Sequence, residues 1–433
     1  MQTHFSLAAL ADSDTAQAEK ILRACVHCGF CTATCPTYLL TGDELDSPRG
    51  RIYLIKDMLE HERPADARVA RHLDRCLSCL SCMTHCPSGV HYMHLVDHAR
   101  AHVEETYSRP VRERLLRNLL AFVLTRPGLL RLALRAVALV KPVVAPFERL
   151  MPASFAAMLA LAPQSPAGAP LAPQIAPAKG VRKLRVALLA GCAQQAINPD
   201  IHAATLRLLT RFGVEVVVAD GAGCCGALPH HLGKADESHE FARRNILAWT
   251  QEKDARGLDY VVVNTSGCGT SVKDYGFMFR DDAALAQKAA QISAMARDVS
   301  EILGEIGYAG QSATPSLRVA YHSACSLQHG QKIVREPVDL LTQAGFDVQL
   351  PPESHICCGS AGVYNVLQLE LAGALRARKV ENIESLSPQL IAAGNIGCMT
   401  QIGAGTRLPV VHTVELLDWA SGGPRPSALR SFF

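Results

Sequence analysis

The chain has 433 residues, of which 48% are hydrophobic and 19% charged, and its formal net charge is +3. This composition is typical of a globular protein with two or three domains, and the small charge argues against nucleic-acid binding. No apolar run is long enough to span a membrane, and Met1–Lys20 lacks the basic start and apolar core of a secretory signal. We therefore expect a cytoplasmic protein, in which 16 cysteines are better explained as metal ligands than as disulfides.

The first predicted element is a helix over 13–24, with Ser13 or Asp14 as its cap. It leads into the first of two copies of one cysteine pattern. The first copy is Cys25-x2-Cys28-x2-Cys31-x3-Cys35-Pro36, and the second is Cys76-x2-Cys79-x2-Cys82-x3-Cys86-Pro87. This spacing is that of bacterial ferredoxins, in which the cysteine before the proline binds the other cluster.

The pattern therefore predicts two [4Fe–4S] clusters. We assign one cluster to Cys25, Cys28, Cys31 and Cys86, and the other to Cys76, Cys79, Cys82 and Cys35. Zinc or disulfides are poorer explanations, because zinc sites use single tetrads rather than paired runs with a crossover.

The residues around these runs predict helices. Ile52, Ile55 and Leu59 have helical spacing within 49–60, and further helices are expected over 65–74 and 90–107, the last with Leu95 and Val96 facing inward. We expect residues 1–107 to form an α-helical ferredoxin domain.

Residues 108–150 combine basic and apolar residues. We predict short basic amphipathic helices, broken by Pro127, Pro142 and Pro146. One interpretation is a surface that rests on anionic lipid or docks a partner; the other is helices packed on the body of the protein with a basic outer face. Arg149 belongs to this basic series.

Residues 151–182 are rich in proline and alanine. We predict a semi-extended linker here and a domain boundary near residue 180. The prolines that suggest it are Pro163, Pro166, Pro170, Pro173 and Pro177.

Beyond the linker the chain repeats itself, and we expect units at 183–312 and 313–433. Leu184–Cys192 matches Leu317–Cys325, and Cys-Cys-Gly recurs at Cys224 and Cys357, both at an offset of 133 residues. A later cysteine recurs as Cys268 and Cys398.

Each unit alternates strands with helices, which implies a parallel sheet with its site at the carboxyl ends of the strands. Strands are expected at 185–189, 214–218 and 260–264, with helices at 202–212 and 236–251, and in the second unit at 319–322, 347–350 and 390–393. The fold class is thus α+β and multidomain: the helical ferredoxin domain, then two tandem α/β Cys-Cys-Gly domains.

Four thiols converge at the rim of each predicted sheet. Gly226 and Gly359 would permit the sharp turn that lets two adjacent cysteines face one centre. We favour iron–sulfur ligation, because it uses all eight cysteines of the repeats; thiols without metal and a docking scaffold are the alternatives. The possible additional metal ligands are Cys192, Cys224, Cys225, Cys268, Cys325, Cys357, Cys358 and Cys398.

Several histidines flank these thiols. His322, His329 and His355 could donate protons or contact a quinone, but we favour hydrogen bonds to cluster sulfurs or backbone. We interpret His230 and His231 in the same way, and His27 as a partly exposed loop residue.

The chain resembles the family of glycolate oxidase iron–sulfur subunits. The resemblance rests on Arg23–Thr37, Gly42–Asp46, Pro48–Lys56, Cys357–Gly362 and Asn395–Thr400. Broader relatives are the anaerobic glycerol-3-phosphate dehydrogenase iron–sulfur subunit, lactate-utilisation proteins and heterodisulfide reductases. The heterodisulfide reductases have a fifth cysteine per unit, where this chain has Ser271 and Gln401.

The resemblance implies a flavin-dependent complex that oxidises glycolate to glyoxylate, with D-lactate as a second substrate. Flavoprotein subunits would hold the flavin, since Gly403–Gly405 is too short for a dinucleotide fingerprint and this chain offers no hydride acceptor. The chain would pass electrons toward the quinone pool from the cytoplasmic face of the inner membrane, without activity alone or catalytic residues. Alternatives are a glycerol-3-phosphate or lactate dehydrogenase subunit, a thiol–disulfide oxidoreductase, and an iron–sulfur assembly or sensing module.

Overall fold

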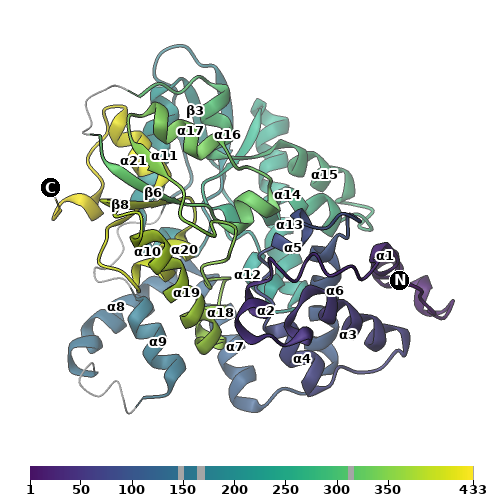
Figure 1. Cartoon of the computed structure of the whole chain (residues 1–433). Coiled ribbons are helices and arrows are strands. Elements are labelled where there is room, and N and C mark those ends of the chain that lie inside the picture. Colours follow the sequence, from purple (N-terminus) through teal and green to yellow (C-terminus); the bar gives the residue numbers. More distant parts are fainter. Residues whose placement is uncertain (145–150, 163–170, 311–315, 433) are drawn as a thin grey trace.

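The computed structural model describes residues 1–144, 151–162, 171–310 and 316–432 (Figure 1). The chain forms a helical N-terminal domain and two α/β units with parallel sheets, as the sequence predicts. The expected boundaries at 107/108 and 182/183 stay predictions, and those at 150 and 312 lie outside the described residues.

The N-terminal domain is built from short helices around a small apolar core. Ile52 and Ile55 are buried against Leu95 and Val96, which confirms the predicted inner faces. The predicted cap of the first helix was wrong, because Asp12 accepts the Thr15 amide at 2.8 Å. The helices are α1 (Ser13–Ala24), α2 (Pro36–Thr41), α3 (Pro48–Glu60), α4 (Ala67–Asp74), α5 (Ser81–Thr84) and α6 (Tyr92–Thr106), with 3-10 turns at Ala9–Ala11 and Glu44–Asp46.

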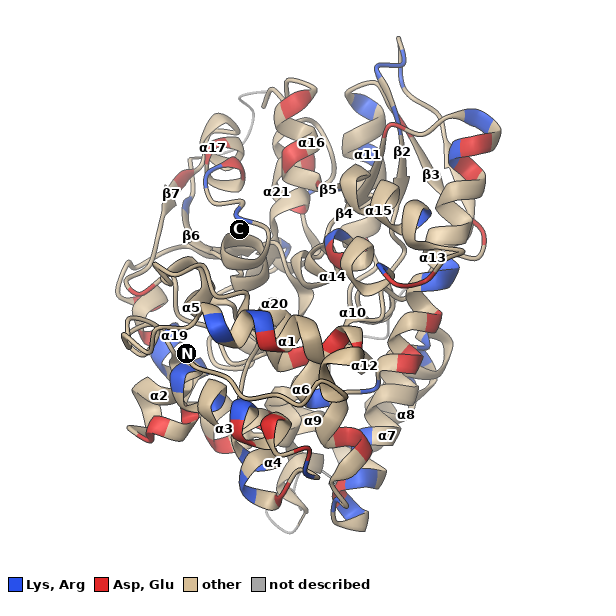
Figure 2. Ribbon diagram, turned by 90° about the vertical axis from the view of Figure 1, so that its right-hand side faces the viewer, with Lys and Arg blue, Asp and Glu red and all other residues tan. Residues whose placement is uncertain are grey.

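The basic region forms α7 (Val111–Leu124), which lies beside the N-terminal domain, and α8 (Pro127–Val144), which packs against α7 and α10 (Ala193–Ile197) of the first α/β unit (Figure 2). Pro127 opens α8, where a missing amide costs nothing, but the predicted break at Pro142 was wrong, because the helix continues to Val144. Pro146 and Arg149 lie outside the described residues.

Part of the positive charge in this region points inward. The Arg109 and Arg117 guanidinium groups contact Asp74 of α4 at 2.6 and 3.4 Å, and Arg131 donates to the Gln195 carbonyl at 2.7 Å. Packing on the protein body thus accounts for these three arginines, while the outer residues of both helices are exposed.

The expectation of a semi-extended linker over 151–182 was wrong for much of its length. The segment contains α9 (Ala153–Leu161), and β1 (Gln174–Ala176) pairs antiparallel with β3. The proline content led to the wrong prediction of an extended segment. The apolar run Ala153–Leu161 forms a helix that packs against α18 and α19, and Pro173 and Pro177 lie on either side of β1. Pro163, Pro166 and Pro170 lie outside the described residues.

The first α/β unit has a sheet of strand order β1-β3-β2-β4-β5, in which every pair except β1–β3 is parallel. Valine-rich β3 is buried on both faces, as expected for a strand covered by helices on two sides. The predicted strands and helices are confirmed. The elements are β2 (Leu184–Leu188), α10 (Ala193–Ile197), α11 (Asp200–Arg211), β3 (Val214–Val218), α12 (Ala227–His231), α13 (Ala235–Arg256), β4 (Tyr260–Val263), α14 (Ser266–Met278), α15 (Ala286–Met295), β5 (Ala296–Asp298) and α16 (Val299–Glu305).

The second unit repeats this topology with the order β7-β6-β8-β9, all parallel. Its three predicted strands are also confirmed. The elements are β6 (Arg318–His322), a π-helical turn at Ser326–Gly330 (η4), α17 (Glu336–Gln343), β7 (Asp347–Gln349), α18 (Tyr364–Leu367), α19 (Leu369–Glu384), β8 (Leu390–Ala393), α20 (Ile396–Gly403), β9 (Val410–His412) and α21 (Thr413–Ala420), with a 3-10 turn at Ser427–Leu429.

The two units share one large core. Residues of β2, β3, α11 and α16 pack with residues of β6, β8, α17 and α21 in a single apolar cluster. Arg207 and Arg211 of α11 pair with buried Asp418 of α21 at 2.6 and 2.9 Å. The rims of the sheets also meet, since the Ser266 and Ser326 hydroxyls lie 2.7 Å apart. Across the described ranges, no helix combines the length and apolar character needed to cross a bilayer.

Candidate metal centres

The first ferredoxin-type run curves around a cavity. Cys25, Cys28, Cys31 and Cys86 line it together with Cys82. The curve is tight because His27 and Gly29 have φ angles of +57° and +86°. These four thiols are the set that the spacing assigns to one cluster; their ligation of metal stays a prediction.

A second cavity is lined by the other predicted set, Cys35, Cys76, Cys79 and Cys82. Cys82 lines both cavities, so the two candidate centres are neighbours. Each predicted set takes three cysteines from one run and a fourth from the other run: Cys86 lines the first cavity and Cys35 the second. This donor set suits iron–sulfur clusters.

Buried charge surrounds the second cavity. The Arg51 Nη1 atom lies 3.9 Å from the Cys35 sulfur, and the Arg51 guanidinium also contacts buried Asp46 at 3.6 Å. Burial alone would raise the pKa of Cys76, but Arg51 and Arg100 bring it below its usual value. Burial raises the pKa of Cys79 and Cys82 well above the usual range, so these thiols would have to release their protons in order to bind a metal.

The thiols of the first α/β unit gather at the carboxyl ends of β2, β3 and β4. The Cys192 and Cys224 sulfurs lie 3.5 Å apart, and contacts continue from Cys224 to Cys225 and from Cys225 to Cys268. Gly226 has a φ of +84°, which confirms the sharp turn expected after the cysteine pair.

The second unit forms the same chain of contacts, from Cys325 to Cys357, Cys358 and Cys398. Gly359 has a φ of +87°. Donor atoms of Cys358, Cys398 and His322 lie within 4.8 Å of one another, and all three residues are buried. The fully buried Lys379 ammonium interacts with Cys325, Cys357 and Cys358.

The second ferredoxin-type set lies against the second unit. Cys79 interacts electrostatically with both Cys325 and Cys357. Leu77 packs in one apolar cluster with Cys325, Cys357 and Tyr364. Three of the four candidate centres thus form a continuous series, from the first cavity through the second to the second α/β unit.

The histidines differ in what they contact. The His329 Nδ1 atom shares a hydrogen bond with Thr84 Oγ1 (2.9 Å), and its Nε2 atom donates to the His355 carbonyl (3.1 Å). These bonds fit the predicted hydrogen-bonding role of His329. His322 has no hydrogen bond to the protein at either ring nitrogen among the described residues, so a hydrogen bond from this ring to a cluster sulfur stays a prediction. His355 and His27 are partly exposed.

The two adjacent histidines of α12 also differ from each other. His230 contacts Asp97 of α6 at 3.2 Å, an interdomain pair, and Asp97 raises the pKa of His230 although burial lowers it. His231 is half-buried, and its Nδ1 atom has no partner in the part of the chain that the structure describes.

Two features of these sites were missed by sequence reasoning. Arg51 and Lys379 each bring a buried positive charge to a group of thiols. A charged residue within an apolar helical pattern is the only signal that could have pointed to them, and many exposed residues give that same signal.

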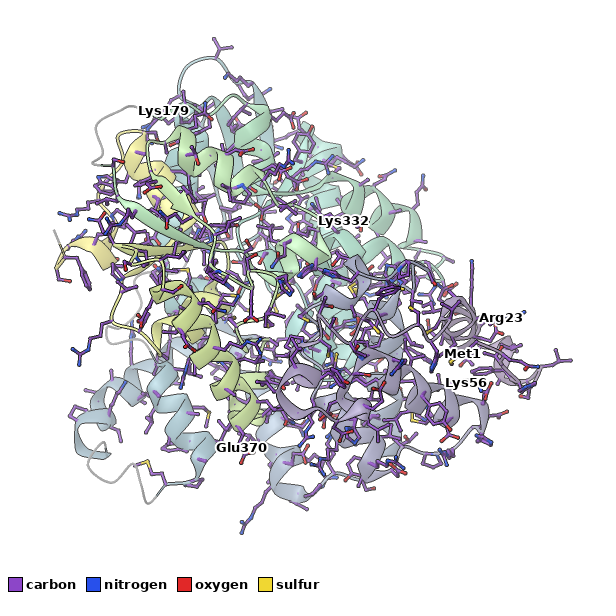
Figure 3. All side chains as sticks on the ribbon, in the orientation of Figure 1. Met1, Arg23, Lys56, Lys179, Lys332 and Glu370 are labelled. Atoms are coloured by element: carbon purple, nitrogen blue, oxygen red, sulfur yellow. The ribbon has the colours of Figure 1, made fainter. Side chains whose placement is uncertain are left out.

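The first candidate centre opens to the surface. Cys28 is exposed, and Val26 and Phe30 are each 66% exposed. The Met1 ammonium donates to the carbonyls of Arg23 (3.0 Å) and Cys25 (2.5 Å), holding the start of the loop. Met1 and Arg23 lie at the side of the molecule away from both sheets (Figure 3).

Comparisons with known proteins agree with this arrangement. The family model for a 4Fe-4S dicluster domain matches residues 21–90, and that for a cysteine-rich domain matches 186–273 and 319–403. The glycolate oxidase iron–sulfur subunit of Escherichia coli is 43% identical, over 97% of this chain and 99% of the relative. The probable glycolate oxidase iron–sulfur subunit of Bacillus subtilis is 30% identical, over 92% and 94%. Lactate utilization protein A of Bacillus subtilis is 25% identical, over 54% of this chain and 99% of the relative.

Proposed function

The chain belongs to the family of glycolate oxidase iron–sulfur subunits, and on this basis we propose that it carries electrons from flavoprotein subunits that oxidise glycolate toward the quinone pool. Iron–sulfur clusters, when bound, accept and release single electrons, which suits a partner whose flavin is reduced by two. We propose two [4Fe–4S] clusters, held by Cys25, Cys28, Cys31 and Cys86 and by Cys35, Cys76, Cys79 and Cys82.

One observation carries the proposal: the candidate centres form a series that begins at the surface and continues inward. Cys28 is exposed at one end, Cys82 lines both ferredoxin-type cavities, and Cys79 lies against Cys325 and Cys357. An electron carrier needs sites that neighbour one another, whereas a substrate-converting enzyme needs one enclosed substrate pocket.

The exposed end is the docking surface that we propose for a flavoprotein subunit. Val26 and Phe30 are large apolar side chains next to Cys28. Exposed apolar residues beside a redox centre favour a protein partner, because docking removes them from water.

The test is co-purification with flavoprotein subunits, followed by glycolate-dependent reduction of a dye. We expect Cys28→Ser to lose most of this activity, while Lys179→Ala, an exposed change at the far end of the molecule (Figure 3), leaves it intact. Full activity in Cys28→Ser would refute the electron-carrier role. D-lactate and glycerol-3-phosphate, assayed in parallel, identify the donor.

We also propose that α7 and α8 rest on an anionic membrane surface. Their exposed apolar residues recur at helical spacing, and exposed Arg112, Arg114, Arg126 and Arg135 accompany them. Basic side chains around an apolar stripe suit anionic lipid headgroups. The stripe comprises Val111, Leu115, Leu119 and Phe122 on α7 and Leu129, Leu132, Leu139 and Val140 on α8.

Vesicle flotation tests the membrane contact. The protein should float with vesicles containing phosphatidylglycerol and remain behind with phosphatidylcholine alone, and salt should weaken the binding. Leu119→Glu with Leu132→Glu should abolish flotation, whereas Leu247→Glu, an equally drastic change on exposed α13, should not. Loss of flavoprotein co-purification instead of flotation would show that the stripe docks a partner.

A further inference from the structure

The two cysteine-rich units are not chemically equivalent. The aligned repeats place Leu189 of the first unit opposite His322 of the second, at the same offset of 133 residues that relates Cys192 to Cys325. Leu189 is 2% exposed within an apolar cluster, and His322 is fully buried among thiols. The second unit therefore has a nitrogen donor at a position where the first unit has only carbon.

His322 is positioned by the sheet. It ends β6 and pairs in register with Ala393 of β8, and β8 leads directly into α20, which carries Cys398 in its first turn. The register thus brings the imidazole to the same rim as the cysteine of the neighbouring strand. The ligand atoms of His322, Cys358 and Cys398 lie within 4.8 Å of one another.

Neither ring nitrogen of His322 makes a hydrogen bond to the protein in the described part of the chain. Both atoms, Nδ1 and Nε2, are buried. Burying a polar atom without a partner destabilises a protein, so two such atoms on one ring need an explanation. A metal bound at one nitrogen would give that nitrogen its partner.

Gln401 stands where the broader relatives have a fifth cysteine, but it is engaged elsewhere. Its amide donates to the Ala372 carbonyl at 3.0 Å, and its oxygen accepts from Asn365 at 3.1 Å. Because both ends of the amide are satisfied, Gln401 does not replace the missing thiol, and His322 is the remaining donor beside Cys358 and Cys398.

We propose that His322 is a metal ligand, so that the second unit holds a centre with mixed nitrogen and sulfur ligation and the first unit a centre with sulfur alone. Zinc and iron both accept thiolate with imidazole, and the experiment distinguishes them. The proposal deepens the proposed function without depending on electron transfer, since a zinc centre would make the second unit structural.

The test uses the full-length chain purified without oxygen, with iron and zinc measured per chain. His322→Leu reproduces the residue of the first unit, and we expect it to lose the metal of the second unit while the remaining metal stays. His322→Cys offers a thiolate instead, and we expect it to retain that metal. Equal metal content in wild type and His322→Leu would overturn the proposal.

The ligand itself is identified spectroscopically. If the metal lost is zinc, X-ray absorption at the zinc edge should show an imidazole shell in wild type that is absent in His322→Cys. If it is iron, labelling histidine with ¹⁵N should change the hyperfine coupling of the reduced centre in wild type and not in His322→Cys. An all-sulfur coordination shell in wild type would refute the proposal even if electron transfer were intact.

Discussion

At the scale of single residues, the glycines that follow the two cysteine pairs, Gly226 and Gly359, leave no room for a larger residue. A Cβ atom at Gly226 would lie 2.7 Å from the Ser238 carbonyl oxygen, and one at Gly359 would lie 2.8 Å from that of Ala372. Both also have positive φ angles. The turn that presents two adjacent thiols to one centre therefore requires glycine for two reasons, conformation and space.

Gly226→Ala should destabilise the protein more than Gly42→Ala. Both glycines have left-handed helical backbone angles, which cost alanine about 1–2 kcal/mol, but Gly42 has open space where the Cβ would lie. We expect Gly226→Ala to lose more than this and to lose metal from the first unit, as measured by denaturant unfolding and metal analysis. Equal losses in the two variants would contradict the crowding argument.

Arg51 and Arg49 provide a second matched comparison. Arg51 is 1% exposed and contacts Asp46, which is also buried, whereas the Arg49 and Glu44 side chains are 33% and 45% exposed. Removing one partner of a buried pair costs about 3–5 kcal/mol, and an exposed pair contributes at most about 1 kcal/mol. Arg51→Met should thus unfold at a much lower denaturant concentration than Arg49→Met. The loss of visible absorbance during denaturation measures this difference.

The sequence indicated which cysteines belong together, because fixed spacing limits which thiols a short loop can present to one centre. It did not indicate that His322 lacks a hydrogen-bond partner or that Arg51 is buried. Those properties depend on residues far away in the chain, such as Ala393 and His72, whose proximity no local pattern encodes.

At the scale of elements, α21 begins with a buried carboxyl group. The Glu415 carboxylate accepts the His412 amide at 3.1 Å and closes a capping box. Burial raises the pKa of Glu415 to about 7, with Asp200 of α11 also raising it and Arg207 opposing. The folded state therefore holds this proton more tightly than the unfolded state does.

The free energy of unfolding should fall as the pH rises through the pKa of Glu415. The benefit of the proton is fully present below the unfolded pKa of 4.5 and is lost as the pH passes about 7, a total on the order of 3 kcal/mol. Glu415→Gln preserves the cap, so it should flatten the decline of the thermal midpoint between pH 5.5 and 8. A slope as steep as that of wild type would contradict this assignment.

Most long elements were predictable, because apolar spacing and valine-rich runs identify a helix or strand locally. Of the four three-residue strands that the structure describes, β7 was predicted, but β1, β5 and β9 were not. Each is too short to show a period, and it becomes a strand only because a neighbouring strand offers free backbone groups. The α9 helix was missed because proline content outweighed a nine-residue apolar run.

At the scale of the whole molecule, the junction between the N-terminal domain and the second unit consists partly of thiols. Cys79 lies against Cys325 and Cys357, and Thr84 bonds His329. The sequence predicted both sets of cysteines, but not that they meet, because more than two hundred residues separate them.

Removing metal with a chelator should therefore loosen this junction first. The N-terminal domain has a small apolar core, so we expect metal bound by its cysteine loops to contribute directly to its folding. We expect amide hydrogen exchange to rise at least tenfold at 76–86 and 325–331, and to change little in α11, which lies in the core shared by the two sheets. Uniform loosening across the chain would contradict a local role.

Cys35 and Cys86 each line the cavity that is otherwise formed mainly by the other cysteine run, and if both bind clusters this exchange should affect how the protein acquires them. Each loop would be missing one ligand until the other loop is in place, so the first cluster to arrive organises the site for the second. We therefore expect the two clusters to load cooperatively. Under iron limitation, a population of these chains should divide into empty and doubly loaded molecules, with few carrying a single cluster, a distribution that native mass spectrometry resolves.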